Sequence, residues 1–142
     1  MGIRESYRFH NGQFEYEPYL IGLNEYTQVG MVLLSLEDIV DVWEFWNELT
    51  KRGESFWNPK WIPLTSGDGG NPICLDYSKS SDFRSTKIIF TRHEFRRRPP
   101  IVSNNFTEFL ERFAADLESG IYVFVEDFGI AVDKSEDEST LE

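Results

Sequence analysis

The sequence has little cysteine and no long apolar run. Cys74 has no second cysteine with which to form an internal disulfide. This excludes a disulfide-stabilised secreted scaffold as a monomer and favours a reducing compartment. No run of about 18 apolar residues occurs, and the N-terminus has no charged-then-apolar signal pattern. We therefore expect a cytoplasmic protein that makes no use of a membrane.

The residues of common catalytic and metal sites are also scarce. His10 and His93 are the two histidines, and neither has cysteine or carboxylate neighbours at metal-ligand spacing. No G-x-S-x-G elbow is present. The glycines at 67–70 lack the Lys-Ser/Thr of a phosphate-binding loop and precede no helix. We expect no cofactor, no metal and no enzymatic activity. An enzyme whose polar pocket is assembled from distant residues is the alternative.

Basic residues are outnumbered, 14 against 25 acidic ones, which gives a net charge of −11. They concentrate in residues 84–98, which carry a local charge of +5, so the remaining residues carry −16. A field of that sign repels phosphate backbones and attracts basic proteins. We expect no nucleic-acid binding and a cationic protein partner. The run Arg96–Arg98 could grip an acidic partner or RNA, although a solvated loop is the favoured interpretation.

What the sequence has in quantity is apolar and aromatic bulk, 40% and 15% of 142 residues. This is enough for the core of one domain, which we place at 1–132. Residues 133–142 hold five acidic residues and one lysine, so we expect a flexible acidic tail. The fold class predicted from the order of elements is α+β. We expect helices at 3–9, 36–52 and 105–120, and strands at 19–23, 31–34, 61–64, 73–77, 87–91 and 121–125.

The helix expected at 36–52 is the best-defined element of the first half. Ser35 suits its N-cap and Gly53 its end. Its apolar residues follow the 3.6-residue period. Its carboxylates are a candidate surface for a basic partner, although they could equally be a plain solvated face. The partner-binding residues that we predict are Glu37, Asp41, Glu44 and Glu48.

Five short motifs follow one another along residues 5–120. They are Tyr7…His10-Asn11-Gly12, Leu33-Leu34-Ser35-Leu36-Glu37, Trp57…Trp61-Ile62-Pro63-Leu64, Gly69-Gly70-Asn71…Cys74-Leu75-Asp76 and Ser103…Phe106-Thr107-Glu108-Phe109-Leu110. In this order they resemble the SUKH superfamily. This superfamily includes fungal cell-wall assembly regulators of the Smi/Knr type and many bacterial toxin-immunity proteins.

The resemblance implies an α+β domain with a mixed, largely antiparallel sheet flanked by helices. It also implies a non-catalytic protein, because members neutralise a cognate toxin by binding it or act as regulators. We therefore expect an immunity protein for a basic toxin domain. The alternative is a regulatory scaffold of the fungal type that binds several host proteins. Members carry a further N-terminal helix ahead of the position of Tyr7, which we expect this chain to lack.

Several motif residues suit turns. Asn11 and Gly12 can adopt positive φ and reverse the chain after a helix. Gly70 falls in the Gly-Asp-Gly-Gly-Asn-Pro link, which has the composition of a hairpin turn. Asp76 closes a strand, and we expect it to bond to a nearby turn backbone.

The remaining motif residues suit packing. Trp57 and Trp61 are large apolar anchors that we expect in the core, with an exposed partner contact as the alternative. Pro63 lies at or beside a strand, which indicates an edge or end position because proline cannot donate to a sheet ladder.

Overall fold

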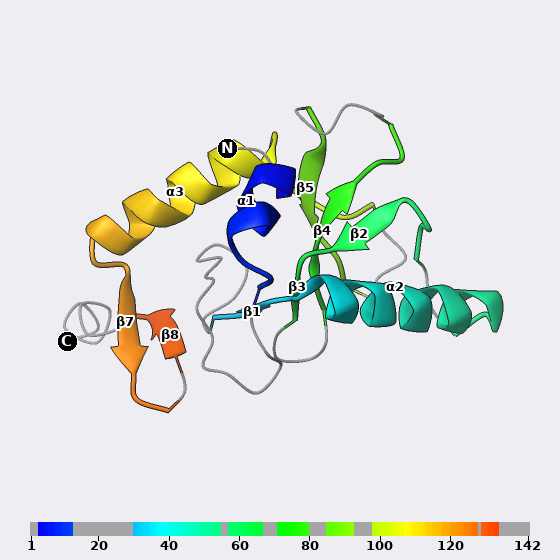
Figure 1. Ribbon diagram of the computed structural model, residues 1–142, viewed down its shortest axis with the longest axis horizontal. Helices are drawn as coiled ribbons and strands as arrows, with labels where there is room; N and C mark the ends of the chain where they lie inside the picture. Colours follow the sequence, from blue (N-terminus) through cyan, green and yellow to red (C-terminus); the bar gives the residue numbers. More distant parts are fainter. Residues whose placement is uncertain are drawn as a thin grey trace, which may run out of the picture.

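The computed structural model describes residues 3–12, 30–54, 57–66, 71–79, 85–92, 98–127 and 129–133. The strand expected at 19–23, Gly70 and the tail beyond Asp133 lie outside these residues. Three helices and eight strands occur in the described ranges (Figure 1). They are α1 (Ile3–Phe9), β1 (Val32–Leu33), α2 (Leu36–Lys51), β2 (Trp61–Pro63), β3 (Thr65–Ser66), β4 (Ile73–Asp76), β5 (Lys87–Phe90), β6 (Ile101–Ser103), α3 (Phe106–Glu118), β7 (Tyr122–Val125) and β8 (Gly129–Val132).

The structure confirms the α+β class and the largely antiparallel pairing. The main sheet has the order β2-β4-β5-β6, and every neighbouring pair in it is antiparallel. Two smaller antiparallel pairs, β1-β3 and β7-β8, accompany it. The strands thus divide among three sheets rather than joining one. Pro63 ends β2, which is an edge strand of the main sheet.

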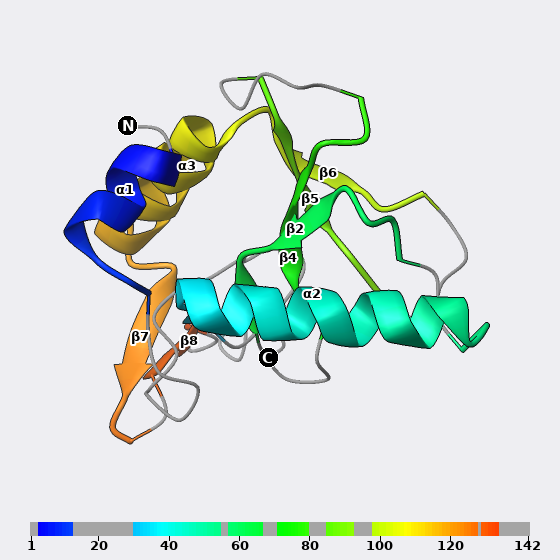
Figure 2. The same ribbon diagram turned by 45° about the vertical axis from the view of Figure 1, so that its right-hand side comes forward.

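Alternation along the central strands places helices on both faces of the main sheet. Ile73 and Leu75 of β4 join one core cluster, whereas Cys74 between them joins the other. Successive side chains of a strand point to opposite faces, so the two clusters lie on opposite sides. The first cluster includes Phe106 and Phe109 of α3, and α1 adds Ile3. The second includes Trp46 of α2, which runs along the other side (Figure 2).

The ends of the two long helices follow from their caps. The Ser35 Oγ accepts a hydrogen bond from the Asp38 N–H at 3.2 Å, and α2 begins at the next residue. The Asn105 Oδ1 accepts from the Glu108 N–H at 2.8 Å in the same manner. Gly53 and Gly120 follow the helix ends with positive φ. These caps confirm the helix starts expected from the sequence, whereas α2 ends at Lys51 and α3 at Glu118, slightly before the expected ends. The cap oxygens satisfy amides that the first turn leaves unpaired.

The β7–β8 hairpin stands apart from the main sheet (Figure 1). The strand expected at 121–125 is β7. Its side chains are unusually exposed for their type, Phe124 at 64%. The buried Ile130 of β8 ties the hairpin to the body, because its carbonyl accepts a hydrogen bond from the Gly30 N–H at 2.9 Å.

Candidate functional site

The junction between α1 and α2 fixes where α2 begins. Gly12 has a φ of +69°. A Cβ there would lie 2.7 Å from the Leu33 carbonyl oxygen and still closer to that of Leu34, so only glycine fits. The sequence suggested that Asn11 could also adopt positive φ. It does not, because Asp127 is the one described residue other than glycine with a positive φ.

Asn11 instead caps α2 from outside the helix. Its Oδ1 accepts a hydrogen bond from the Leu36 N–H at 3.0 Å, and its Nδ2 donates to Glu37 Oε2 at 2.8 Å. The hydrogen bond from Asn11 lowers the pKa of the Glu37 carboxyl, because it favours the ionised form. Sequence reasoning missed this role, since the cap residue stands 25 positions before the amide that it binds.

Tyr7 and His10 complete the junction. The Tyr7 hydroxyl donates to the Leu34 carbonyl oxygen at 2.6 Å, and burial raises the pKa of Tyr7 to about 12. The His10 Nδ1 accepts from the Gly12 N–H at 3.0 Å. The neutral ring therefore carries its proton on Nε2, which lies 2.7 Å from the Ser6 Oγ and donates to it. The family-type motif around His10 thus joins α1 to the start of α2.

The tryptophans form a stack beneath α2. Trp57 is 6% exposed and lies between Trp46, stacked at a centroid distance of 5.9 Å, and Trp61, edge-on at 5.5 Å. Trp61 is half-buried at the start of β2. Trp43, on the same helix as Trp46, donates from Nε1 to the Pro59 carbonyl oxygen at 2.8 Å. The stack holds α2 against the segment before β2.

Asp76 closes β4, where its Oδ1 accepts a hydrogen bond from the Ser78 N–H at 2.9 Å. This Asx turn leaves that oxygen engaged with backbone. Cys74 is fully buried on β4, and burial raises the pKa of its thiol well above its ordinary value. A buried neutral thiol is a poor nucleophile, so the role of Cys74 is to pack in the core.

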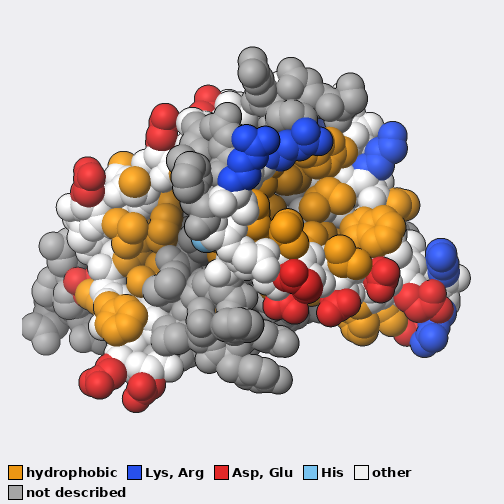
Figure 3. Space-filling model, in the orientation of Figure 1, with side chains coloured by type: hydrophobic (Ala, Val, Ile, Leu, Met, Phe, Trp, Pro, Cys, Tyr) orange, Lys and Arg blue, Asp and Glu red, His pale blue; other side chains and the backbone are white. Residues whose placement is uncertain are grey.

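The outward face of α2 carries the carboxylates predicted from the sequence. Glu37, Asp41, Glu44 and Glu48 are all exposed, and their spacing places them on one side of the helix. Figure 3 shows carboxylates in a row along this helix. Glu48 has an ion pair, with Arg52 at 3.4 Å. Within the described ranges, neither Asp41 nor Glu44 has a basic side chain within ion-pair distance.

Exposed apolar side chains border this acidic face on both sides, a feature that the sequence pattern did not reveal. Leu36 and Val40, 52% and 51% exposed, lie along one margin, and Phe45, 55% exposed, lies on the other. The helical period therefore gives α2 a stripe of carboxylates between two apolar margins. Exposed apolar groups beside charged ones are typical of protein-binding surfaces.

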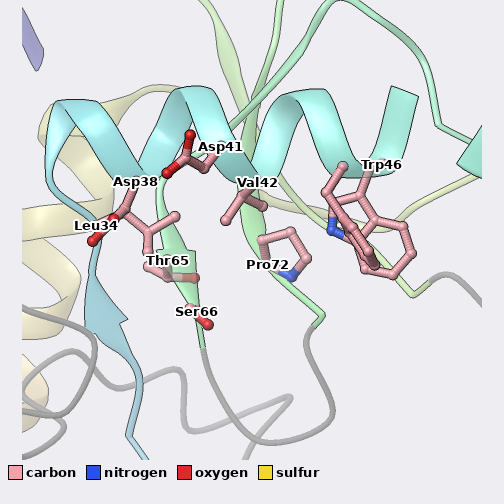
Figure 4. A pocket seen from close by; sticks show the side chains of 9 residues that line it. Leu34, Asp38, Asp41, Val42, Trp46, Thr65, Ser66 and Pro72 are labelled. Atoms are coloured by element: carbon pink, nitrogen blue, oxygen red, sulfur yellow. The ribbon is translucent and has the colours of Figure 1, made fainter. Parts of the chain in front are cut away.

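Hollows adjoin both apolar margins of the acidic face. The first lies between α1 and α2, has a volume of about 460 Å³ and includes Arg4 and Arg8 among its lining residues. Figure 3 shows an apolar strip with basic side chains above it and carboxylates below. The second, of about 310 Å³, lies along the opposite flank of α2 (Figure 4). Its lining residues are Leu34, Asp38, Asp41, Val42, Phe45, Trp46, Thr65, Ser66 and Pro72.

Two kinds of feature were not found among the described residues. They contain no group of three or more His, Cys, Asp or Glu side chains arranged to hold a metal ion. None of their helices has both the length and the apolar character needed to cross a membrane. The fold and this site define an α+β domain with an exposed acidic and apolar helix face.

Comparison with known proteins identifies the family. The model of the SMI1/KNR4 family (SUKH-1) matches residues 2–112, which is most of the chain. The chain belongs to this family. The match includes α1, α2, the main sheet and the first half of α3, whereas β7 and β8 follow it.

Curated relatives come from yeasts. The chain is 34% identical over 70 residues to the cell wall assembly regulator SMI1 of Saccharomyces cerevisiae. It is 34% identical over 73 residues to the KNR4/SMI1 homolog 1 of Debaryomyces hansenii. These alignments cover 49% and 50% of this chain but 14% and 16% of the relatives. The chain thus matches about one seventh of their length.

Proposed function

We propose that the chain is a non-catalytic protein-binding domain whose α2 face binds a cationic protein, most simply as an immunity protein that neutralises a basic toxin domain. The observation that carries this proposal is the exposed stripe of Glu37, Asp41, Glu44 and Glu48 between apolar margins. Carboxylates of one sign steer a basic partner into contact, and exposed apolar groups supply the surface that becomes buried on binding.

The charge of the whole chain supports this proposal. The net charge is −11, and Asp41 and Glu44 have no basic neighbour within ion-pair distance in the described residues. Such carboxylates stay hydrated in the free protein and gain partners only on binding. Association is then fast at low salt and slows as salt screens the field over about 10 Å.

The test is calorimetry with any basic toxin domain that is encoded beside the gene, at low and at moderate salt. We expect tight one-to-one binding that weakens with salt. The double variant Glu44→Lys/Glu48→Lys should weaken it by roughly tenfold, mainly through the association rate. The matched control is Glu111→Lys/Glu118→Lys on α3, which makes the same change in net charge at two exposed sites.

The control separates a specific face from a general field. Equal loss in both double variants would show that only net charge matters, and the α2 face would then be the wrong site. An absence of binding at concentrations well above micromolar would remove this toxin as the partner.

A second candidate is a regulatory scaffold that binds several host proteins. The name of one relative, cell wall assembly regulator, supports it. The two functions differ in the number of partners. The scaffold would be favoured if several host proteins bind the purified chain directly and Glu44→Lys/Glu48→Lys weakens the binding of each. One tight toxin partner would favour the immunity protein.

A further inference from the structure

We propose that the hollow on the flank of α2 between Leu34 and Trp46 is a socket for one arginine side chain of the partner protein. This inference rests on the proposed function and deepens it, because it names the group that anchors a cationic partner. The socket is defined by the nine lining residues given above and is drawn in Figure 4.

The floor of the socket suits an aliphatic stem. Leu34, Thr65 and Pro72 are buried and lie below α2, which contributes the half-buried Val42. Figure 4 shows Pro72 facing Val42 across the hollow, with Trp46 at the far end from Leu34. The three methylenes of an arginine would cover this apolar surface while the charged end stays accessible to solvent.

The rim of the socket suits a cation. Asp38 and Asp41 lie three residues apart on α2 and both line the hollow. In Figure 4 the Asp38 carboxylate lies toward Leu34, whereas that of Asp41 lies on the side away from Pro72. Side chains three residues apart on a helix have Cβ atoms about 5–6 Å apart, so a single cationic group can reach both. In the described residues, no lysine or arginine lies within ion-pair distance of either carboxylate. The rim thus offers two carboxylates that no cation of the described residues neutralises.

The shape and the aromatic walls favour arginine over lysine. A guanidinium is planar and presents five donors in a fork, so it can bond two separate carboxylates at once. It also stacks on aromatic rings. Phe45 is 55% exposed and meets Trp46 edge-on at a centroid distance of 5.2 Å, so its ring stands at the wall of the socket. An ammonium group would use one carboxylate and gain less from the ring.

The test uses small probes and the whole chain. Isotope-labelled protein is titrated with the blocked peptides acetyl-Gly-Arg-Gly-amide, its lysine counterpart and its citrulline counterpart, and amide shifts are followed by NMR. We expect the arginine peptide to shift Val42, Phe45 and Ser66 in a saturable way, with a Kd in the millimolar range. The lysine peptide should bind about threefold more weakly and the uncharged citrulline peptide at least tenfold more weakly.

Variants locate the site within α2. Asp38→Asn and Asp41→Asn should each weaken the arginine peptide about three- to fivefold. Glu48→Gln is the matched control, because it removes one carboxylate from the same helix outside the socket and should change the Kd less than twofold. Any of three results would overturn the proposal. The arginine and lysine peptides could bind equally, Glu48→Gln and Asp41→Asn could lose the same affinity for the arginine peptide, or the amides at the socket could show no shift.

The same variants separate this proposal from the proposed function. If binding of a partner protein is weakened by Glu44→Lys/Glu48→Lys but unaffected by Asp38→Asn and Asp41→Asn, Glu44 and Glu48 remain part of the binding face and the socket is refuted as the anchor. If the toxin domain does not bind at all while the arginine peptide occupies the socket, the choice of partner fails and the socket remains.

Discussion

Replacement of Gly12 by alanine isolates the close approach between the α1–α2 junction and the end of β1. The change has two costs. A φ of +69° is left-handed, which costs a residue with a Cβ about 1–2 kcal/mol. The new Cβ would also press on the Leu33 and Leu34 carbonyl groups, where backbone has to move, at about 2–3 kcal/mol by analogy with overpacking.

The expected loss is therefore about 3–5 kcal/mol, reduced by the roughly 0.5 kcal/mol that alanine gains by restricting the unfolded chain. This is a large part of the 5–15 kcal/mol typical of a domain. At about 3 °C per kcal/mol for a chain of this size, the Tm should fall by about 10 °C. Urea unfolding followed by tryptophan fluorescence measures the free energy directly.

Gly53→Ala provides the control. Gly53 has nearly the same φ, +76°, but an added Cβ there meets nothing within 4 Å. It should lose only about 1 kcal/mol, from the backbone conformation alone. The difference between the two variants, about 2–3 kcal/mol, measures the contact with Leu33 and Leu34. If Gly12→Ala is no more destabilising than Gly53→Ala, the argument from close approach is wrong.

Three further predictions follow from the same region and its neighbours. Asn11→Ala should raise the Glu37 pKa toward its ordinary 4.5, which NMR titration measures. A lowered carboxyl pKa stabilises the fold above that value and no longer does so at low pH. The difference in unfolding free energy between wild type and variant should therefore close as pH falls, which acid unfolding measures. Tyr7→Phe should cost about 1 kcal/mol at neutral pH. The gap should narrow between pH 10.0 and about 12, because only the wild type loses the Tyr7 contribution there, as this phenol ionises in the unfolded chain before it ionises in the fold. Trp57→Phe should cost about 1–2 kcal/mol in thermal unfolding, because its Nε1 has no partner among the described residues and only ring packing is lost; a loss above 4 kcal/mol would show an unseen hydrogen bond.

Local signals in the sequence predicted the helices well. Ser35 and Asn105 are caps that act within three residues, and the structure shows both bonds. Gly53 and Gly120 mark helix ends because glycine adopts positive φ without steric cost, whatever its neighbours are. Three strands of the main sheet, β2, β4 and β5, also follow from short apolar runs between turn residues, as at 73–76, whereas the strand at 101–103 was not predicted.

Features that depend on distant residues could not be predicted in this way. The bond from Asn11 to the start of α2 joins positions that are close only after α1 has packed. The socket needs Asp38 and Pro72 to line the same hollow, although they are far apart in sequence. The apolar margins of the acidic face also could not be predicted, because the helical period places Leu36 and Val40 on the same apolar face as the buried Trp46, whereas both are half exposed.

The position of Pro63 limits how this protein can meet any other chain. On either side of β2, the Lys60 carbonyl accepts from the Tyr77 N–H and the Leu64 N–H donates to the Ile73 carbonyl, so the backbone groups of Trp61 and Pro63 point away from β4. The Trp61 N–H already donates a hydrogen bond to the Asn58 carbonyl oxygen at 2.9 Å, and Pro63 has no backbone N–H. This edge therefore has no donor to offer an incoming strand. Neither a partner peptide nor a second copy can extend the sheet here, so the domain avoids edge-to-edge aggregation at this strand.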